Sequence, residues 1–363
     1  MRVDAFDYHL PEELIASEPL PERDASRLLV LGPDGLDDRR VVDLPRLAPA
    51  RCLVIVNDTR VIPARLLGHR KPTGGKVEIF LCERVSDPGG AEEIWRALGR
   101  ASKELRPGTE LDFGPLAAIV RGRTEDGMLE VALSTREHPS VAAAIEAVGH
   151  VPLPPYIKRA DRPADRERYQ TVFAASDGAV AAPTAGLHLT ERIFDELRAA
   201  GAEIAKVTLH VGLGTFQPVT AEDLDDHAMH SERYVVPVET ARAIDRARER
   251  GAAVLAVGTT SVRALESARD PERPGRVRPS SGDTRLLIQP GHTFGVVDAL
   301  FTNFHLPRST LLALACAFGG TERVLSAYAH AARAGYRFTS YGDAMLMLPR
   351  PLAVAPPRGE ERP

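Results

Sequence analysis

Three stretches in the second half of the chain share one pattern, in which a helix is followed by a glycine and then by an apolar strand. They cover residues 190–209, 239–258 and 322–342. Gly201, Gly251 and Gly335 each stand where a helix C-terminus favours a left-handed residue. Apolar runs at 26–31 and 52–58 add two strands nearer the start. The pattern predicts an α/β domain with a mostly parallel sheet.

Residues 64–138 differ, because a helical period is almost absent there. Short strand candidates are separated by Gly, Pro and Asp, and they cover residues 76–83, 93–100, 109–114, 117–123 and 128–134. This predicts a small antiparallel β-barrel inserted into the α/β domain, with a helix over 140–149 at its end. The expected units are a discontinuous α/β domain over 1–62 and 150–348, a barrel over 63–149, and a disordered tail over 349–363.

The composition bounds the class of protein. Hydrophobic residues make up 44% of the 363 residues, enough for a buried core, and the formal net charge is −4. A nucleic-acid surface would therefore be a local basic patch on a mildly acidic body. Cys52, Cys82 and Cys316 lack metal-ligand spacing, which fits a reducing cytosol. Without a secretory leader or an apolar run of membrane length, we expect a soluble cytoplasmic protein that uses no membrane.

The stretch 208–219, TLHVGLGTFQPV, joins a strand pattern to a glycine-rich turn. It lacks the third glycine of a dinucleotide fingerprint, and Pro218 keeps the chain extended. The chain also has no GK[ST] phosphate loop. We therefore interpret the turn as a strand end whose glycines let the backbone approach a ligand, with His210 on the polar face of the strand.

Two further loops follow predicted strands. Gly258–Ser261 opens a helix, so its backbone N–H groups and hydroxyls could bind an anion, although an ordinary helix cap is the alternative. Asn303 and His305 follow the next strand, and Tyr341 and Asp343 lie in a turn after another. Ligand sites of open α/β sheets lie at such strand ends.

A metal site is not predicted. The His227-x-x-His230 pair is the one close histidine pair, and it lacks both the HExxH helix signature and cysteine partners. A lone histidine is more often hydrogen-bonded within the structure than bound to a metal.

Long and unusual motifs run from residue 4 to residue 347. They read DAFDYHLP, EPLPERDASRLLVL, NDTRVIPARLLG, GGKVEI, LPPYIKR, DRERYQTVFA, GAVAAPTAGLHLT, VTLHVGLGTFQPV, HAMHSERY, AVGTTSVRALES, DALFTNFHLPRSTLL and SYGDAML. In content and order they resemble the S-adenosylmethionine:tRNA ribosyltransferase-isomerase family of queuosine biosynthesis. Leu189 and Gln217 depart from the family pattern, which has phenylalanine and arginine there.

The resemblance implies a transferase and isomerase that moves the ribosyl part of S-adenosylmethionine onto 7-aminomethyl-7-deazaguanine at the tRNA wobble position. The products are epoxyqueuosine-tRNA, adenine and methionine. S-adenosylmethionine is then a substrate, and no cofactor or metal is implied. The expected partners are S-adenosylmethionine and a tRNA carrying the precursor base, and we expect a monomer.

The implied reaction needs a base for a C5′ proton beside the sulfonium and an acid for the departing adenine, and histidines or carboxylates suit both roles. The candidate catalytic residues are His188, His210, His230, His305, Glu232 and Asp343. An aromatic face suits the sulfonium, and a helix N-terminus or an arginine suits the methionine carboxylate. The candidate S-adenosylmethionine-binding residues are Gly212, Gly214, Thr215, Phe216, Gly258, Thr259, Thr260, Ser261, Arg263, Asn303 and Tyr341.

A tRNA substrate needs a basic surface. Residues 60–76 contain five cations and no acid, and residues 156–170 add a second, more mixed run. The candidate tRNA-binding residues are Arg60, Arg65, Arg70, Lys71, Lys76, Lys158 and Arg159. Two other classes stay open on the residues alone: a non-catalytic RNA-binding α/β protein and a metal-dependent hydrolase. The many histidines near strand ends disfavour the first, and metal analysis tests the second.

Overall fold

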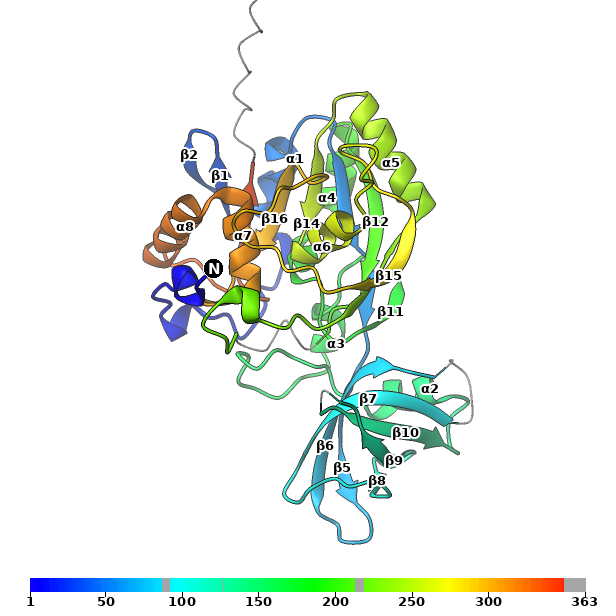
Figure 1. Ribbon diagram of the computed structural model, residues 1–363. Coiled ribbons are helices and arrows are strands. Elements are labelled where there is room, and N and C mark those ends of the chain that lie inside the picture. The colour runs from blue at the N-terminus through cyan, green and yellow to red at the C-terminus, as the bar shows by residue number, and fades with distance from the viewer. Residues whose placement is uncertain (87–91, 126, 213–218, 349–363) are drawn as a thin grey trace, which may run out of the picture.

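The computed structural model describes residues 1–86, 92–125, 127–212 and 219–348. Its larger part is built on a nine-stranded sheet with the order β15-β13-β12-β3-β14-β16-β17-β1-β2 (Figure 1). The strands are β1 Arg27–Gly32, β2 Gly35–Arg40, β3 Leu53–Asn57, β12 Glu203–Leu209, β13 Glu232–Val236, β14 Val254–Val257, β15 Ser280–Thr284, β16 Ala299–Asn303 and β17 Ala344–Met347. Every residue of β3 is buried, as expected for a strand covered on both faces.

The sheet combines parallel and antiparallel pairs. The neighbours β12, β3, β14 and β16 are parallel, and so are β17 and β1. Antiparallel pairs join β15 to β13, β13 to β12, β16 to β17 and β1 to β2. The α/β class with an inserted antiparallel barrel is confirmed. The sheet is mixed rather than mostly parallel, because strands outside the helix–glycine–strand units add the antiparallel pairs.

Helices cover both faces of the sheet. On one face lie α1 Leu44–Leu47 and α4 Glu191–Ala199, and on the other lie α5 Val238–Glu249, α6 Thr259–Ser267, α7 Thr310–Gly319 and α8 Thr321–Arg333. Alternate residues of β3 enter the two cores: Leu53 and Ile55 face one, and Val54 and Val56 face the other.

The three helix-ending glycines adopt the predicted left-handed conformation. Their φ angles are +87° at Gly201, +66° at Gly251 and +69° at Gly335. α4 leads into β12 and α5 leads into β14, as predicted. The strand predicted directly after Gly335 is wrong, because that segment forms only an isolated bridge at Phe338 before β17 begins. The backbone of this segment is hydrogen-bonded in part to a side chain, because the Arg337 N–H donates to the Asp343 carboxylate.

The smaller part is a closed antiparallel barrel with the order β10-β7-β6-β5-β8-β9, which lies below the sheet in Figure 1. Its elements are β5 Arg65–Arg70, β6 Lys76–Arg84, β7 Glu92–Ala101, β8 Glu110–Asp112, β9 Leu116–Arg123, β10 Leu129–Thr135 and the helix α2 Val141–Val148. All five predicted strand runs form strands, and α2 packs into the barrel core. The strand β5 was not predicted, because its arginines and histidine resemble a solvated basic run.

The chain enters and leaves the barrel at one place. β4 Thr59–Val61 and β11 Ser176–Ala179 form a parallel pair beside the entry. Arg65 and His150, at the two ends of the insert, exchange backbone N–H···O hydrogen bonds of 3.3 and 2.8 Å. Among the described residues, no helix combines the length and apolarity that a bilayer crossing requires.

Candidate functional site

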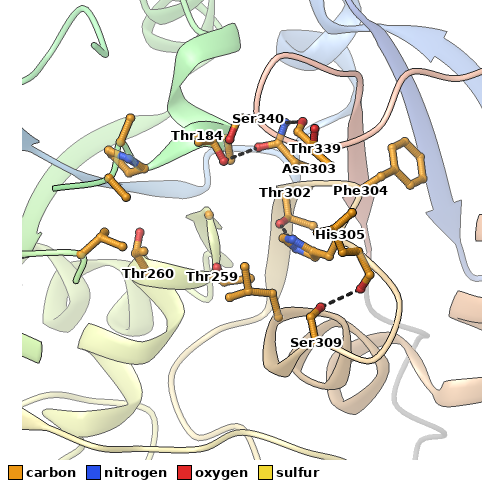
Figure 2. Close-up of a pocket in the computed structure, with 18 of the residues that line it drawn as sticks. Thr184, Thr259, Thr260, Thr302, Asn303, Phe304, His305, Ser309, Thr339 and Ser340 are labelled. Carbon is orange, nitrogen blue, oxygen red and sulfur yellow. Dashed lines mark hydrogen bonds between the residues drawn. The ribbon is translucent and has the colours of Figure 1, made fainter. Parts of the chain in front are cut away.

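A cavity of about 340 Å³ lies at the carboxyl ends of the parallel strands β14 and β16. One wall is the start of α6 at Gly258–Thr260, and another is the connection from β16 to α7 at Thr302–Ser309. The start of the 3₁₀ segment η5 Thr184–His188, with the residues before it, and the turn at Thr339–Ser340 form further parts of the lining (Figure 2). This is the edge at which open α/β sheets bind ligands.

Asn303 fixes the polar wall of the cavity. Its Oδ1 accepts a hydrogen bond from Thr184 Oγ1 at 3.0 Å, and its Nδ2 donates to the Thr339 carbonyl at 3.2 Å (Figure 2). The same amide nitrogen donates to His188 Nε2 at 3.0 Å. The second nitrogen of His188 must then carry the proton, and it donates to Ser26 Oγ at 3.1 Å.

His188 and His305 take different places around this wall. His188 is buried behind Asn303 and does not line the cavity, so it orients the amide. His305 lines the cavity, and its Nε2 lies 3.0 Å from Thr302 Oγ1. Burial lowers the pKa of each imidazole to about 4, so both rings are neutral at pH 7. A neutral imidazole that reaches a cavity can accept a proton from a ligand there.

Two threonine hydroxyls in the cavity wall have no partner among the described residues. Thr260 Oγ1 and Thr339 Oγ1 are both buried without a hydrogen bond. Buried polar atoms are nearly always bonded, so these two indicate where a polar ligand would bind. Beside Thr260, the first N–H groups of α6 also lie at the cavity, and Gly258 before them has a φ of +85°.

Tyr156 lines the cavity, whereas the ring of Phe304 points away from it and packs on Tyr328 and Phe338 (Figure 2). Tyr156 OH lies 2.6 Å from Ser340 Oγ. Tyr341, a binding candidate, does not line this cavity, and its hydroxyl donates to Asp165 at 2.9 Å. Sequence reasoning missed Tyr156, and its one signal was the proline-rich LPPYIKR motif that carries it.

Residues 3–347 match the family described as "Queuosine biosynthesis protein". The chain belongs to this family. A protein of Sorangium cellulosum named S-adenosylmethionine:tRNA ribosyltransferase-isomerase is 58% identical over 368 residues, covering 96% of this chain and 98% of its own. A relative of the same name from an Anaeromyxobacter species is 55% identical over 348 residues, with coverages of 96% and 99%.

A solved structure of the S-adenosylmethionine tRNA ribosyltransferase from Thermotoga maritima is also similar. It is 37% identical, covers 95% of this chain and 100% of its own, and has a TM-score of 0.53. The barrel and the mixed sheet therefore belong to the architecture of this queuosine family.

Glu232, a catalytic candidate, and Arg263, a binding candidate, form a buried ion pair outside the large cavity. Glu232 Oε1 also accepts the Gly212 N–H at 3.0 Å. Together with His230 and His227 they line a second, smaller cavity of about 20 Å³. Arg263 and the Gly258–Thr260 turn, the two alternatives for the methionine carboxylate, therefore line different cavities, and the Ser261 hydroxyl donates to the Val257 carbonyl at 2.7 Å.

Two more catalytic candidates lie outside the large cavity. Both Asp343 carboxylate oxygens accept backbone N–H groups, from Arg27 and Arg337 at 2.8 Å each, so this side chain joins β1 to the turn before β17. Its pKa is raised by burial. His210 lies where β12 ends, with Nδ1 2.8 Å from Thr59 Oγ1, and burial lowers its pKa. Of the remaining candidates, Gly214, Thr215 and Phe216, with the departure Gln217, lie outside the described residues.

The tRNA-binding candidates are more strongly paired than the sequence indicated. Carboxylates contact five of them, in the pairs Arg60–Asp177, Arg65–Glu78, Lys71–Asp112, Lys158–Glu12 and Arg159–Asp165. Arg159 is only 13% exposed and braces the loop that carries Tyr156, so it is poorly placed for a phosphate. Arg70, Lys71 and Lys76 remain together at the tip of the β5–β6 hairpin, where both lysines are exposed.

Among the described residues, no group of three or more His, Cys, Asp or Glu side chains could hold a metal ion.

Proposed function

We propose that the large cavity is the site at which this protein transfers and isomerises the ribosyl moiety of S-adenosylmethionine. The acceptor is 7-aminomethyl-7-deazaguanine at the tRNA wobble position, and the products are epoxyqueuosine-tRNA, adenine and methionine. The observation that carries the proposal is the neutral His305 in a cavity that also offers unpartnered hydroxyls and a helix N-terminus. The names of the relatives support the same reaction class.

His305 has the properties that the first step requires. The sulfonium makes the neighbouring C5′ protons acidic, and a neutral imidazole can remove one of them. Because burial lowers its pKa to about 4, the imidazolium formed is a strong acid that can return the proton to a nitrogen of the departing adenine. Thr302 holds the ring through Nε2, which leaves Nδ1 for this exchange.

The direct test is to incubate the protein with S-adenosylmethionine and a tRNA that carries the aminomethyl precursor base. Adenine and methionine should appear in equal amounts with the modified tRNA. If tRNA is bound but neither product forms, the non-catalytic RNA-binding class would replace this proposal.

We expect activity to survive prolonged treatment with EDTA, because S-adenosylmethionine is a substrate and the proposed steps use only side chains. The assay is adenine release after chelation, with magnesium returned to a parallel sample to control for tRNA folding. Stoichiometric zinc whose removal abolishes turnover in both samples would instead support the metal-dependent class.

The tip of the β5–β6 hairpin is our proposed contact for tRNA phosphates, and it lies in the barrel domain that we place at 63–149. Replacing Arg70, Lys71 and Lys76 with Ala should weaken tRNA binding, because contacts to phosphates are lost. Each lost contact should also lower the slope of log affinity against log salt concentration by about one unit. Affinity for S-adenosylmethionine alone should not change. The measurement is tRNA affinity over a series of salt concentrations.

The matched control replaces three exposed arginines, two in α5 and one directly after it, at the end of the molecule away from the barrel (Figure 1). They are Arg242, Arg246 and Arg250. Equal salt slopes for the wild type and the hairpin variant would show that the tip of the β5–β6 hairpin is exposed to solvent and does not contact tRNA. We further propose that the protein acts in the cytoplasm as a monomer.

A further inference from the structure

The second cavity contains a buried cation whose donors are only partly used. Arg263 is 5% exposed; its Nε donates to the Leu286 carbonyl at 3.0 Å and its Nη1 contacts Glu232. Its Nη2 is buried and has no hydrogen-bond partner among the described residues. A buried guanidinium with an unpartnered nitrogen is costly unless a ligand or a water accepts from it.

This cavity adjoins the large one. Leu311 lines both, and α6 supplies residues to each: Thr259 and Thr260 to the large cavity and Arg263 to the small one. Residues three and four positions apart lie on the same face of a helix, with Cβ atoms about 5–6 Å apart. A ligand whose reacting part occupies the large cavity could therefore extend an arm along α6 to Arg263.

The lining defines what kind of arm fits. The walls are apolar, formed by Met229, Leu286, Leu287, Ile288, Leu311 and Leu314. The volume of about 20 Å³ is little more than the space of one water molecule, so a base or a sugar does not fit. At the end stand a cation and an anion side by side, so a lone phosphate would meet the Glu232 carboxylate as well as Arg263. A zwitterion, with its own carboxylate and ammonium, complements both charges.

We infer that Arg263 and Glu232 form the subsite for the α-amino-acid end of S-adenosylmethionine, the part that leaves as methionine. Arg263 Nη2 donates to the α-carboxylate, Glu232 accepts from the α-ammonium, and the apolar walls contact the methylene arm. This inference rests on the proposed function. It makes Glu232 a binding group rather than a proton-transfer group, and it separates recognition of methionine from the chemistry at His305.

The test compares S-adenosylmethionine with its decarboxylated analogue, which keeps the sulfonium and the nucleoside but lacks the α-carboxylate. Calorimetry should show that the wild type binds the analogue about 10- to 100-fold more weakly, the range expected for hydrogen bonds to a charged group. Arg263→Met should weaken S-adenosylmethionine binding by a similar factor and bind the two ligands almost equally. Arg242→Met, on the exposed face of α5, should keep the wild-type ratio.

A second variant guards against misfolding, because Arg263→Met leaves Glu232 buried without its cation. Glu232→Leu with Arg263→Met removes both charges, a replacement that buried pairs often tolerate. It too should bind both ligands alike, with a cooperative thermal transition. Equal binding of both ligands by the wild type, or a wild-type ratio in a folded variant, would mean that the pair is only structural. Adenine release by the wild type tests the proposed function separately, because the binding ratio needs no turnover.

Discussion

Replacing His305 with Gln is expected to lower turnover by about 10²–10⁴-fold, the usual contribution of one acid–base group. The affinity for S-adenosylmethionine and for tRNA should change little, because Gln can still bond to Thr302, which is the one side-chain hydrogen bond of the ring within the described part of the chain. The measurement is single-turnover adenine release at saturating substrates, which separates the chemical step from binding and product release.

The matched controls are two other histidines. His330 lies on α8 at the surface, where it pairs with Asp38, and His330→Gln should retain turnover. His210→Gln tests the competing candidate at the end of β12. If the His305 variant stays near full activity while the His210 variant loses it, the proton transfer belongs to His210 and the proposed role of His305 is wrong.

Acidification is expected to destabilise the fold steeply between pH 6.5 and pH 4. His188 and His305 have folded-state pKa values of about 4, against about 6.5 when unfolded, so the unfolded chain binds more protons in this window. The stability they confer is fully present above pH 6.5 and is lost as the pH falls through the folded-state pKa. The loss is on the order of 3 kcal/mol for each histidine, and His210 adds to it in the same direction.

Denaturant unfolding at half-unit pH steps measures this loss. The double variant His188→Gln, His305→Gln should start less stable at pH 7 but show a much flatter slope below pH 6.5. A wild-type stability that stays constant down to pH 4.5 would mean that burial does not lower the pKa of these imidazoles in the folded protein.

Much of the fold could be predicted from local patterns. The glycines at 201 and 251 mark real helix ends, and five barrel strands are recognisable from short runs broken by turn residues. The antiparallel pairs of the large sheet could not be predicted, because periodicity is the same for parallel and antiparallel strands. The segment after Gly335 looked like a strand because it is aromatic, but Asp343 binds its backbone through a contact that no local pattern specifies.

The candidate site was predictable in position but not in detail. The cavity lies at strand ends, and Asn303 and His305, two candidates from the sequence, line it. Whether a side chain at a strand end faces the cavity or its rear depends on tertiary packing, which is why His188 and His305 were indistinguishable in the sequence. Residues 60–76 contain no acidic residue, so their cations looked unpaired in the sequence. Lys71 pairs with Asp112, which comes much later in the chain.

The contact between Arg65 and His150 has a consequence for how the barrel arose and how it could be removed. Because residues near the start and the end of the insert are hydrogen-bonded neighbours, the insert is a loop that is already closed at its base. The entropy of closing such a loop grows only with the logarithm of its length, so a whole domain costs the host little more than a long hairpin. The barrel could therefore be gained, exchanged or replaced by a short turn without any change in the path of the host strands.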